Sequence, residues 1–152
     1  MFRGFCTVSI DVKGRIGVPA RYRELLAADA SPTLVVTVNP WDRCLWLYPL
    51  SQWETIDAKL LALPDGDQAS RRAKQIIRGQ AIDCECDRQG RILIPPELRR
   101  FAAIEQRAAL LGQGNKLELW DATTWTRQRD SWLQALEAGA APNSTVLAAL
   151  SL

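Results

Sequence analysis

The sequence predicts a β-rich α+β fold, a pseudo-two-fold β-barrel built from two internal repeats and capped by helices. Three observations support this: an ordered internal duplication, a glycine turn between short apolar runs in each copy, and helical segments after each set of runs. The chain has 152 residues, of which 47% are hydrophobic and 24% charged. That composition suits one compact domain or two very small ones and excludes a disordered chain.

The duplication is read directly from the sequence. Residues 11–19, DVKGRIGVP, match residues 87–95, DRQGRILIP, at an offset of 76 positions. Further pairs keep the same order: Arg23 with Arg99, Leu34 with Leu110, Asn39 with Asn115 and, after a four-residue deletion, the segment 45–48 with 117–120. Chance matches seldom keep their order over some 50 residues, so we infer two copies of one module.

Each copy begins with a predicted hairpin. A strand leads into an aspartate, and the pairs Lys13-Gly14 and Gln89-Gly90 predict a two-residue primed turn, because glycine adopts a positive φ without penalty. Short strands follow over 15–18 and 91–94, each ended by a proline that also suits the first turn of a helix.

The remaining elements repeat in the same order. The residues Ser51 to Glu54 form a capping-box pattern, which predicts that Ser51 begins a helix. The predicted strands are 33–38, 44–48, 108–111 and 116–120, and the predicted helices are 20–30, 51–63, 67–78, 96–104 and 123–138.

A half of about 50 residues buries little apolar surface alone, so we expect the two halves to pair with each other. The predicted organisation is a first repeat at 5–52, a helical linker at 53–80, a second repeat at 81–124, and a C-terminal helix and tail at 125–152.

Composition excludes several chemistries. The chain has no histidine, which rules out histidine-dependent catalysis and imidazole metal ligands. Of its four cysteines only Cys84 and Cys86 lie close together, and a structural zinc site needs a second pair. We expect the cysteines to be small core residues, and we expect neither a metal nor a cofactor.

Charge is unevenly distributed along the chain. The net charge of +2 divides into +3 over residues 1–24, −4 over 25–70, +4 over 71–114 and −1 over 115–152. Two positive segments permit a nucleic-acid partner without establishing one. The apolar runs are too short to cross a bilayer, and the first residues lack a signal peptide, so the sequence predicts a soluble cytoplasmic protein with no membrane partner.

Five motifs resemble those of the MraZ family: MFRG at 1–4, DVKGRIGVPARYR at 11–23, LWLYP at 45–49, DRQGRILIP at 87–95 and NKLELWD at 115–121. The resemblance covers roughly residues 1–130 and is weak over the last twenty. It implies an AbrB-like swapped-hairpin barrel and a DNA-binding regulator, generally a repressor of its own promoter at the head of the division and cell-wall gene cluster. It also implies ring-shaped homo-oligomers and association with the nucleoid.

The expected site consists of the two hairpin turns. The family's Asp-x-x-x-Arg motif corresponds to Asp11 with Arg15 and to Asp87 with Arg91. The expected partner is double-stranded promoter DNA with repeated half-sites. We expect DNA contacts from Lys13, Arg15, Arg88, Gln89 and Arg91, and turn-forming roles for Asp11, Gly14, Asp87 and Gly90. The alternative to a DNA contact is that each arginine only forms a surface ion pair with the aspartate of its own turn.

Other candidates stay open. One set lies on the predicted linker helix and forms either a solvated helix face or a contact with phosphate or another subunit: Arg71, Lys74 and Arg78. A second set lies on the helices after the hairpins, where salt bridges are as plausible as DNA binding: Arg21, Arg23, Arg99 and Arg100. Trp53, Trp125 and Trp132 fit apolar helix faces, whereas Trp41 is expected to be exposed. Two rival functions are an antitoxin-like module that binds a protein through its tail, and a hydrolase that uses Asp11 and Asp87. We expect no catalytic residues.

Overall fold

The computed structural model describes residues 1–29, 31–139, 146 and 149–150. The chain divides into two compact units, residues 1–122 and residues 123–152. The first unit contains every strand of the described chain and therefore both copies of the duplicated module. The boundaries expected for the repeats and the linker stay a prediction.

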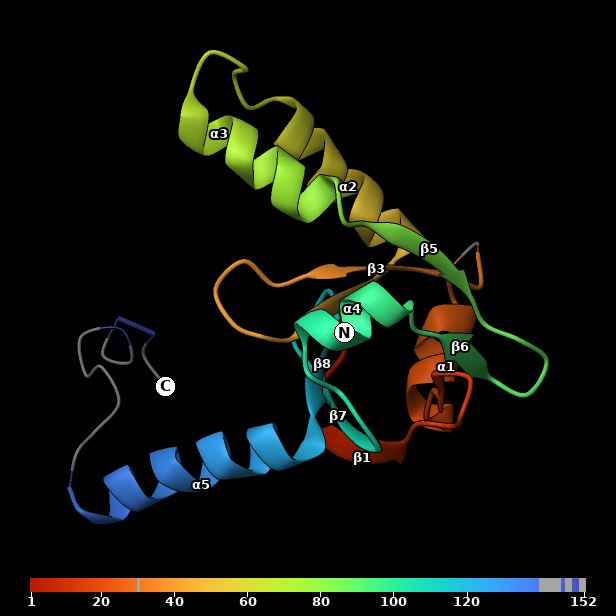
Figure 1. Cartoon of the computed structure of the whole chain (residues 1–152), viewed down its shortest axis with the longest axis vertical. Helices are drawn as coiled ribbons and strands as arrows, with labels where there is room; N and C mark the ends of the chain where they lie inside the picture. Colours follow the sequence, from red (N-terminus) through yellow and green to blue (C-terminus); the bar gives the residue numbers. More distant parts are fainter. Residues whose placement is uncertain (30, 140–145, 147–148, 151–152) are drawn as a thin grey trace. The chain divides into compact units, whose positions relative to one another are not determined.

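Six strands form one antiparallel sheet (Figure 1). In spatial order they are β1 (Phe5–Ser9), β7 (Arg107–Gly112), β8 (Leu117–Asp121), β4 (Leu45–Pro49), β3 (Thr33–Val38) and β5 (Ile82–Glu85). Within the described residues β1 and β5 are the two edges of this sheet, so its strand pairing does not close a barrel. The fold is a mixed α/β fold around a large antiparallel sheet.

The two remaining strands, β2 (Arg15–Gly17) and β6 (Arg91–Leu93), pair with each other in a short antiparallel ribbon, and Ile16 of β2 also bridges to Ile10, just beyond β1. The counterparts in the two repeats are β1 and β5, β3 and β7, and β4 and β8. If each strand is exchanged for its counterpart, the sheet has the same strand order read from the opposite edge. The ribbon obeys the same symmetry, because Ile16 pairs with its own counterpart Ile92. The expected pseudo-two-fold arrangement is confirmed at the level of strand order, and each repeat completes the sheet of the other.

The helices after the hairpins are shorter than predicted. α1 (Ala20–Ala27) and α4 (Pro96–Phe101) each follow a proline that ends the preceding strand. Ala103, just beyond α4, has a φ of 51°, which a right-handed helix cannot contain.

The predicted capping box is wrong. α2 (Leu50–Leu61) begins one residue earlier, after Pro49, with no side-chain cap. Ser51 is therefore inside the first turn, and its hydroxyl donates a 2.8 Å hydrogen bond to the Asp29 carboxylate.

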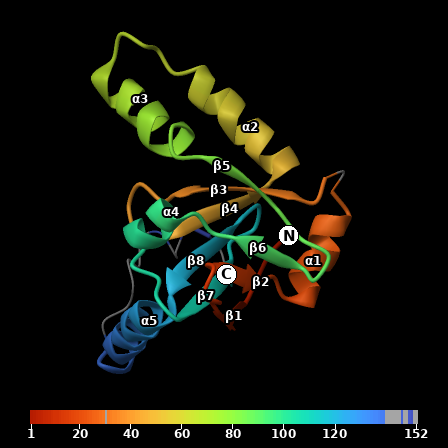
Figure 2. The same ribbon diagram turned by 45° about the vertical axis from the view of Figure 1, so that its right-hand side comes forward.

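The predicted linker helix is two segments, α3 (Gln68–Ala73) and a π-helical turn, η1 (Lys74–Arg78). The Thr37 hydroxyl donates a 2.6 Å hydrogen bond to the carbonyl of Ile77, within that turn. Figure 2 shows α2 and α3 lying along each other. The basic side chains expected on the linker helix are engaged within the chain: Lys74 pairs with Asp65, Arg78 pairs with Asp57, and Arg71 donates to the Asp65 carbonyl.

One apolar core joins the sheet to the ribbon. Ile16 and Ile92 from the ribbon and Leu34 and Leu110 from the sheet are fully buried in the same cluster. Burial of each such side chain stabilises the fold by about 1.5–3 kcal/mol. A second cluster, which includes the buried Trp53, lies under α2. The cysteines are all buried or half-buried, as expected for core residues.

The second unit contains most of α5 (Ala122–Glu137). Trp125 and Trp132 pack edge to face, with ring centroids 5.8 Å apart. Trp132 is 55% exposed, so it packs against Trp125 but does not lie on the core-facing side of the helix that the apolar helix face predicts. No helix of the described residues is long and apolar enough to cross a membrane.

Candidate functional site

Both hairpins close with three-residue loops. In the first, the Gly14 amide donates to the Asp11 carbonyl (3.0 Å) and the Asp11 amide donates to the Arg15 carbonyl (3.0 Å). Gly90 and Asp87 make the matching bonds in the second hairpin, at 3.0 and 2.8 Å. The predicted two-residue primed turn is wrong, because it requires a positive φ at Lys13 and at Gln89 and neither residue has one.

The aspartate in the first turn holds both the loop and the arginine. Asp11 Oδ1 accepts from the backbone amides of Lys13 (3.0 Å) and Arg15 (2.9 Å). Its Oδ2 accepts from Arg15 Nε at 2.6 Å. One carboxylate oxygen therefore holds the loop through two backbone amides, and the other oxygen fixes the direction of the guanidinium.

The second turn repeats this arrangement. Asp87 Oδ1 accepts from the amides of Gln89 and Arg91, both at 2.9 Å, and Oδ2 accepts from Arg91 Nε at 2.9 Å. In both turns the bond uses only Nε, and within the described chain the terminal nitrogens of Arg15 and Arg91 donate to no other residue. Those nitrogens are the part of a guanidinium that binds a planar acceptor pair.

The pKa values of both aspartates are lowered from the usual 3.8. The main cause for Asp11 is the hydrogen bond from the Arg15 backbone amide, with smaller contributions from the Arg15 side chain and the Lys13 amide. The Arg91 amide has the same effect on Asp87. Both carboxylates stay ionised at neutral pH and are occupied by the turn, which does not suit a general base.

Each turn is supported by an arginine of the other repeat. Gly14 has a φ of +88°, and a Cβ there would lie 2.6 Å from Arg99 Cζ. Gly90 has a φ of +75°, and its Cβ would lie 2.6 Å from Arg23 Cδ. Only glycine satisfies both the backbone angle and the close approach, so both glycines are needed structurally.

Backbone hydrogen bonds also cross between the repeats. The Gly14 carbonyl accepts from the Ile94 amide (3.0 Å), and the Gly90 carbonyl accepts from the Val18 amide (2.8 Å). Sequence reasoning missed the supporting roles of Arg23 and Arg99, although their alignment at the repeat offset was a signal.

The tips of the two turns carry the same charge at different positions and differ in the polarity of the other residue. The first tip consists of Val12 and Lys13 and the second of Arg88 and Gln89, and all four residues are exposed. Each tip therefore presents one cation, at a different position. The expected contact residues thus lie on the surface, with Arg15 and Arg91 half-buried beside them.

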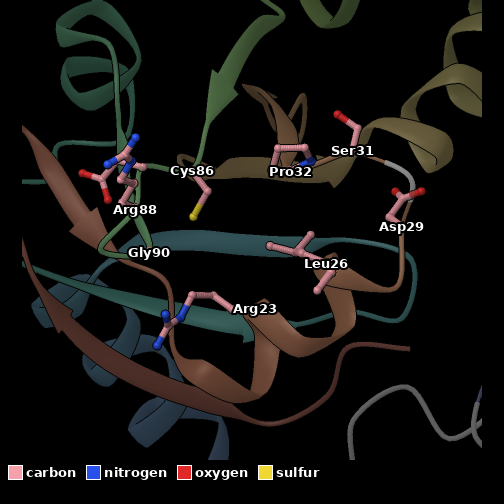
Figure 3. Close-up of a pocket in the computed structure, with 10 residues that line it drawn as sticks. Arg23, Leu26, Asp29, Ser31, Pro32, Cys86, Arg88 and Gly90 are labelled. Atoms are coloured by element: carbon pink, nitrogen blue, oxygen red, sulfur yellow. The ribbon is translucent and has the colours of Figure 1, made fainter.

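A cavity of about 310 Å³ lies beside the second turn, lined by α1 and by the segment around Cys86. Figure 3 shows Arg23 reaching from α1 toward Gly90, and Cys86 directed toward the cavity. The described residues contain no group of acidic or cysteine side chains placed to hold a metal ion.

The fold and the site together define a class of protein: a duplicated chain with interleaved strands that presents two aspartate-held arginines on the outer side of one ribbon. A family model described as "MraZ protein, putative antitoxin-like" matches residues 1–76 and again residues 77–145. The chain belongs to the MraZ family.

Full-length relatives agree with this assignment. The chain is 45% identical to a protein of Thioalkalivibrio sulfidiphilus, 43% identical to one of Halorhodospira halophila and 44% identical to one of Shewanella sediminis. Each match spans 152 residues, which is the whole of both chains, and each relative is named transcriptional regulator MraZ.

Proposed function

We propose that the chain is a sequence-specific regulator of transcription that binds double-stranded DNA through its two hairpins. The observation that carries the proposal is the repeated clamp, in which an aspartate holds Arg15 or Arg91 by Nε and leaves the terminal nitrogens available. Arg15 and Arg91 both lie on the outward face of one ribbon, so the two guanidinium groups can be offered to one ligand.

The chemistry of the site fits a duplex. A guanidinium donates two parallel hydrogen bonds to a phosphate or to O6 and N7 of guanine, and the major groove admits a two-stranded ribbon. Lys13 and Arg88 are exposed at the tips, and we propose that they contact the phosphates that flank the groove. Gln89 carries no charge and the cation of the second tip is at Arg88 instead, so the two hairpins contribute unequally.

The names of the relatives support a regulatory role, and the family resemblance supports its target. The target is the chain's own promoter and the division and cell-wall gene cluster, where it acts as a repressor on the nucleoid. One pair of turns makes few contacts, so a ring-shaped homo-oligomer gains affinity by engaging several repeated half-sites at once.

The same proposal includes the finer architecture, an AbrB-like swapped-hairpin barrel in which the ribbon covers the open side of the sheet. Its support is the shared core of the ribbon and the sheet.

The test is a mobility-shift assay with the DNA upstream of the chain's own gene, a scrambled duplex as control, and a salt series. Four basic side chains per chain predict a log–log salt dependence with a slope of about −3 or steeper. Equal affinity for the scrambled duplex would falsify the proposal.

A second candidate follows from the family description, whose words "antitoxin-like" suit a module that binds a protein. The expected contact, the chain beyond Gly139, lies largely outside the described residues. A partner that co-purifies through that segment, together with no binding to promoter DNA, would favour this candidate.

A further inference from the structure

The outer face of the ribbon is not symmetric between the repeats. Arg15 pairs across the ribbon with Leu93, and Arg91 pairs with Gly17. Side chains alternate along a strand and Ile16 and Ile92 are fully buried, so these four residues share the opposite, outward face. The leucine and the glycine hold equivalent positions in the two repeats.

Leu93 is an apolar side chain that the core does not use. It is 51% exposed, whereas its neighbours Ile92 and Ile94 are fully buried. Residues directly opposite on paired strands have Cβ atoms about 4.5–5.5 Å apart. Leu93 therefore stands beside Arg15 on the surface proposed to enter DNA.

Arg91 has no such neighbour. A Cβ at Gly17 would meet no atom of the described residues within 4 Å, so within that part of the chain the space across from Arg91 is open. One end of the ribbon thus presents a cation next to a branched apolar group, and the other end presents a cation alone.

These two ends match different base-pair steps. In the major groove arginine pairs with O6 and N7 of guanine, and an apolar side chain contacts the C5-methyl group of thymine. We infer that Leu93 is a specificity-determining residue that contacts the methyl group of a thymine adjacent to the guanine bound by Arg15. The inference rests on the proposed function and means that the two ends of the ribbon read different sequences.

A packing role for Leu93 would have a different signature. A leucine that only covers the aliphatic part of Arg15 would change affinity for all duplexes alike. Contact with a methyl group changes the response to that group alone, so the decisive change is made in the DNA.

The experiment begins with duplexes selected in vitro by the full-length wild-type chain. Each thymine is replaced in turn by deoxyuridine, which lacks only the methyl group, and each guanine by 7-deazaguanine. The guanine whose replacement weakens wild-type binding but not binding by Arg15→Ala marks the Arg15 contact. At a thymine next to it, deoxyuridine is expected to weaken wild-type binding about fourfold.

Two variants complete the cycle. Leu93→Ala is expected to bind the thymine and deoxyuridine duplexes equally, and Gly17→Leu is expected to create a new methyl dependence beside the Arg91 contact. Equal wild-type binding to every deoxyuridine duplex overturns the inference without using any variant. An unchanged fourfold ratio for Leu93→Ala also overturns it.

The failure of the proposed function looks different. If the wild-type chain selects no sequence, both the function and the inference fall. If it selects a site that depends on Arg15 but not on any thymine methyl group, only the assignment of Leu93 falls. Thermal denaturation of each variant confirms that it is folded.

Discussion

The two hairpins of this chain share a scaffold and differ at their contact surfaces. In both, an aspartate holds the loop and the arginine through the same three hydrogen bonds, and a buried glycine rests on an arginine of the other repeat. At the tips, valine and lysine of the first hairpin correspond to arginine and glutamine of the second. On the ribbon, Gly17 corresponds to Leu93.

This difference separates two kinds of constraint. Positions that set the geometry of the turn are the same in both copies, because the backbone angle and the ion pair tolerate few side chains. Positions that point to solvent have diverged, because folding does not constrain them. The divergent positions are therefore the ones at which the two halves can recognise different features of one ligand.

The largest expected effect on folding comes from the turn glycines. Gly14→Ala and Gly90→Ala force a side chain into the left-handed region, which costs about 1–2 kcal/mol before any displacement of the supporting arginine. We expect Gly90→Ala to be the more destabilising, because its Cβ would meet Arg23 Cδ, nearer the backbone than the Arg99 guanidinium. The free energy of unfolding in urea measures both changes.

Gly17→Ala is the matched control for the glycine variants. Among residues 1–29 and 31–139 no atom lies within 4 Å of its Cβ position, and its φ is not positive. We expect its free energy of unfolding to stay within about 0.5 kcal/mol of the wild-type value. Equal destabilisation by all three alanines would contradict the role assigned to the turn geometry.

A smaller effect is expected from the aspartates. Asp11→Asn retains an acceptor for the loop amides but loses the charge that holds Arg15 Nε. We expect about a three- to tenfold loss of operator affinity and a smaller loss for Asp87→Asn. Because the aspartate acts through the arginine, Asp11→Asn added to Arg15→Ala should cause no further loss. Additive losses would show that Asp11 acts independently.

Substitutions that exchange the residue types of Lys13 and Gln89 should change the salt dependence of DNA affinity more than they change the DNA sequence that the chain prefers. Lys13→Gln removes one phosphate contact and should reduce the salt slope by about 1, whereas Gln89→Lys should increase it by about 1. Shift assays at four or more salt concentrations measure these slopes. Unchanged slopes would place both tips away from the phosphates.

The smallest effect is expected from pH. The pKa values of Asp11 and Asp87 are lowered below 3.8, chiefly by the backbone amides of their arginines. A lowered pKa stabilises the fold above the unfolded value and loses that contribution as the pH falls through the folded value. We therefore expect the contribution of these two aspartates to the free energy of unfolding to be constant between pH 8 and about 5 and to be lost only below 3.8, as measured by urea unfolding over a pH series. A transition near pH 6 would require a group that this histidine-free chain lacks.

Much of the fold could be predicted because the duplication supplied two readings of each element. The strands β3 (Thr33–Val38), β4 (Leu45–Pro49), β7 (Arg107–Gly112) and β8 (Leu117–Asp121) lie within one residue of the predicted ranges. Their apolar runs specify them locally, although only β3 is rich in β-branched residues.

Features that depend on tertiary contacts could not be predicted. The prediction of a cap at Ser51 was wrong because α2 already begins after Pro49. The π-helical turn η1 could not be predicted because it coincides with a hydrogen bond from Thr37, which is distant in sequence. The location of the expected site residues on two turns could be predicted, and their contact with DNA stays a prediction. The pairing of Leu93 with Arg15 could not be predicted, because the register of the ribbon is set by contacts between the repeats.

The most direct test of the account is the operator affinity of Arg15→Ala and Arg91→Ala beside Arg127→Ala, at one salt concentration. Arg127→Ala removes the same charge from an exposed position of α5. The account predicts about a 5- to 150-fold loss for Arg15→Ala, a smaller loss for Arg91→Ala, near wild-type binding for Arg127→Ala, and unchanged unfolding curves. An Arg15→Ala chain that binds the operator as tightly as the wild type would contradict it.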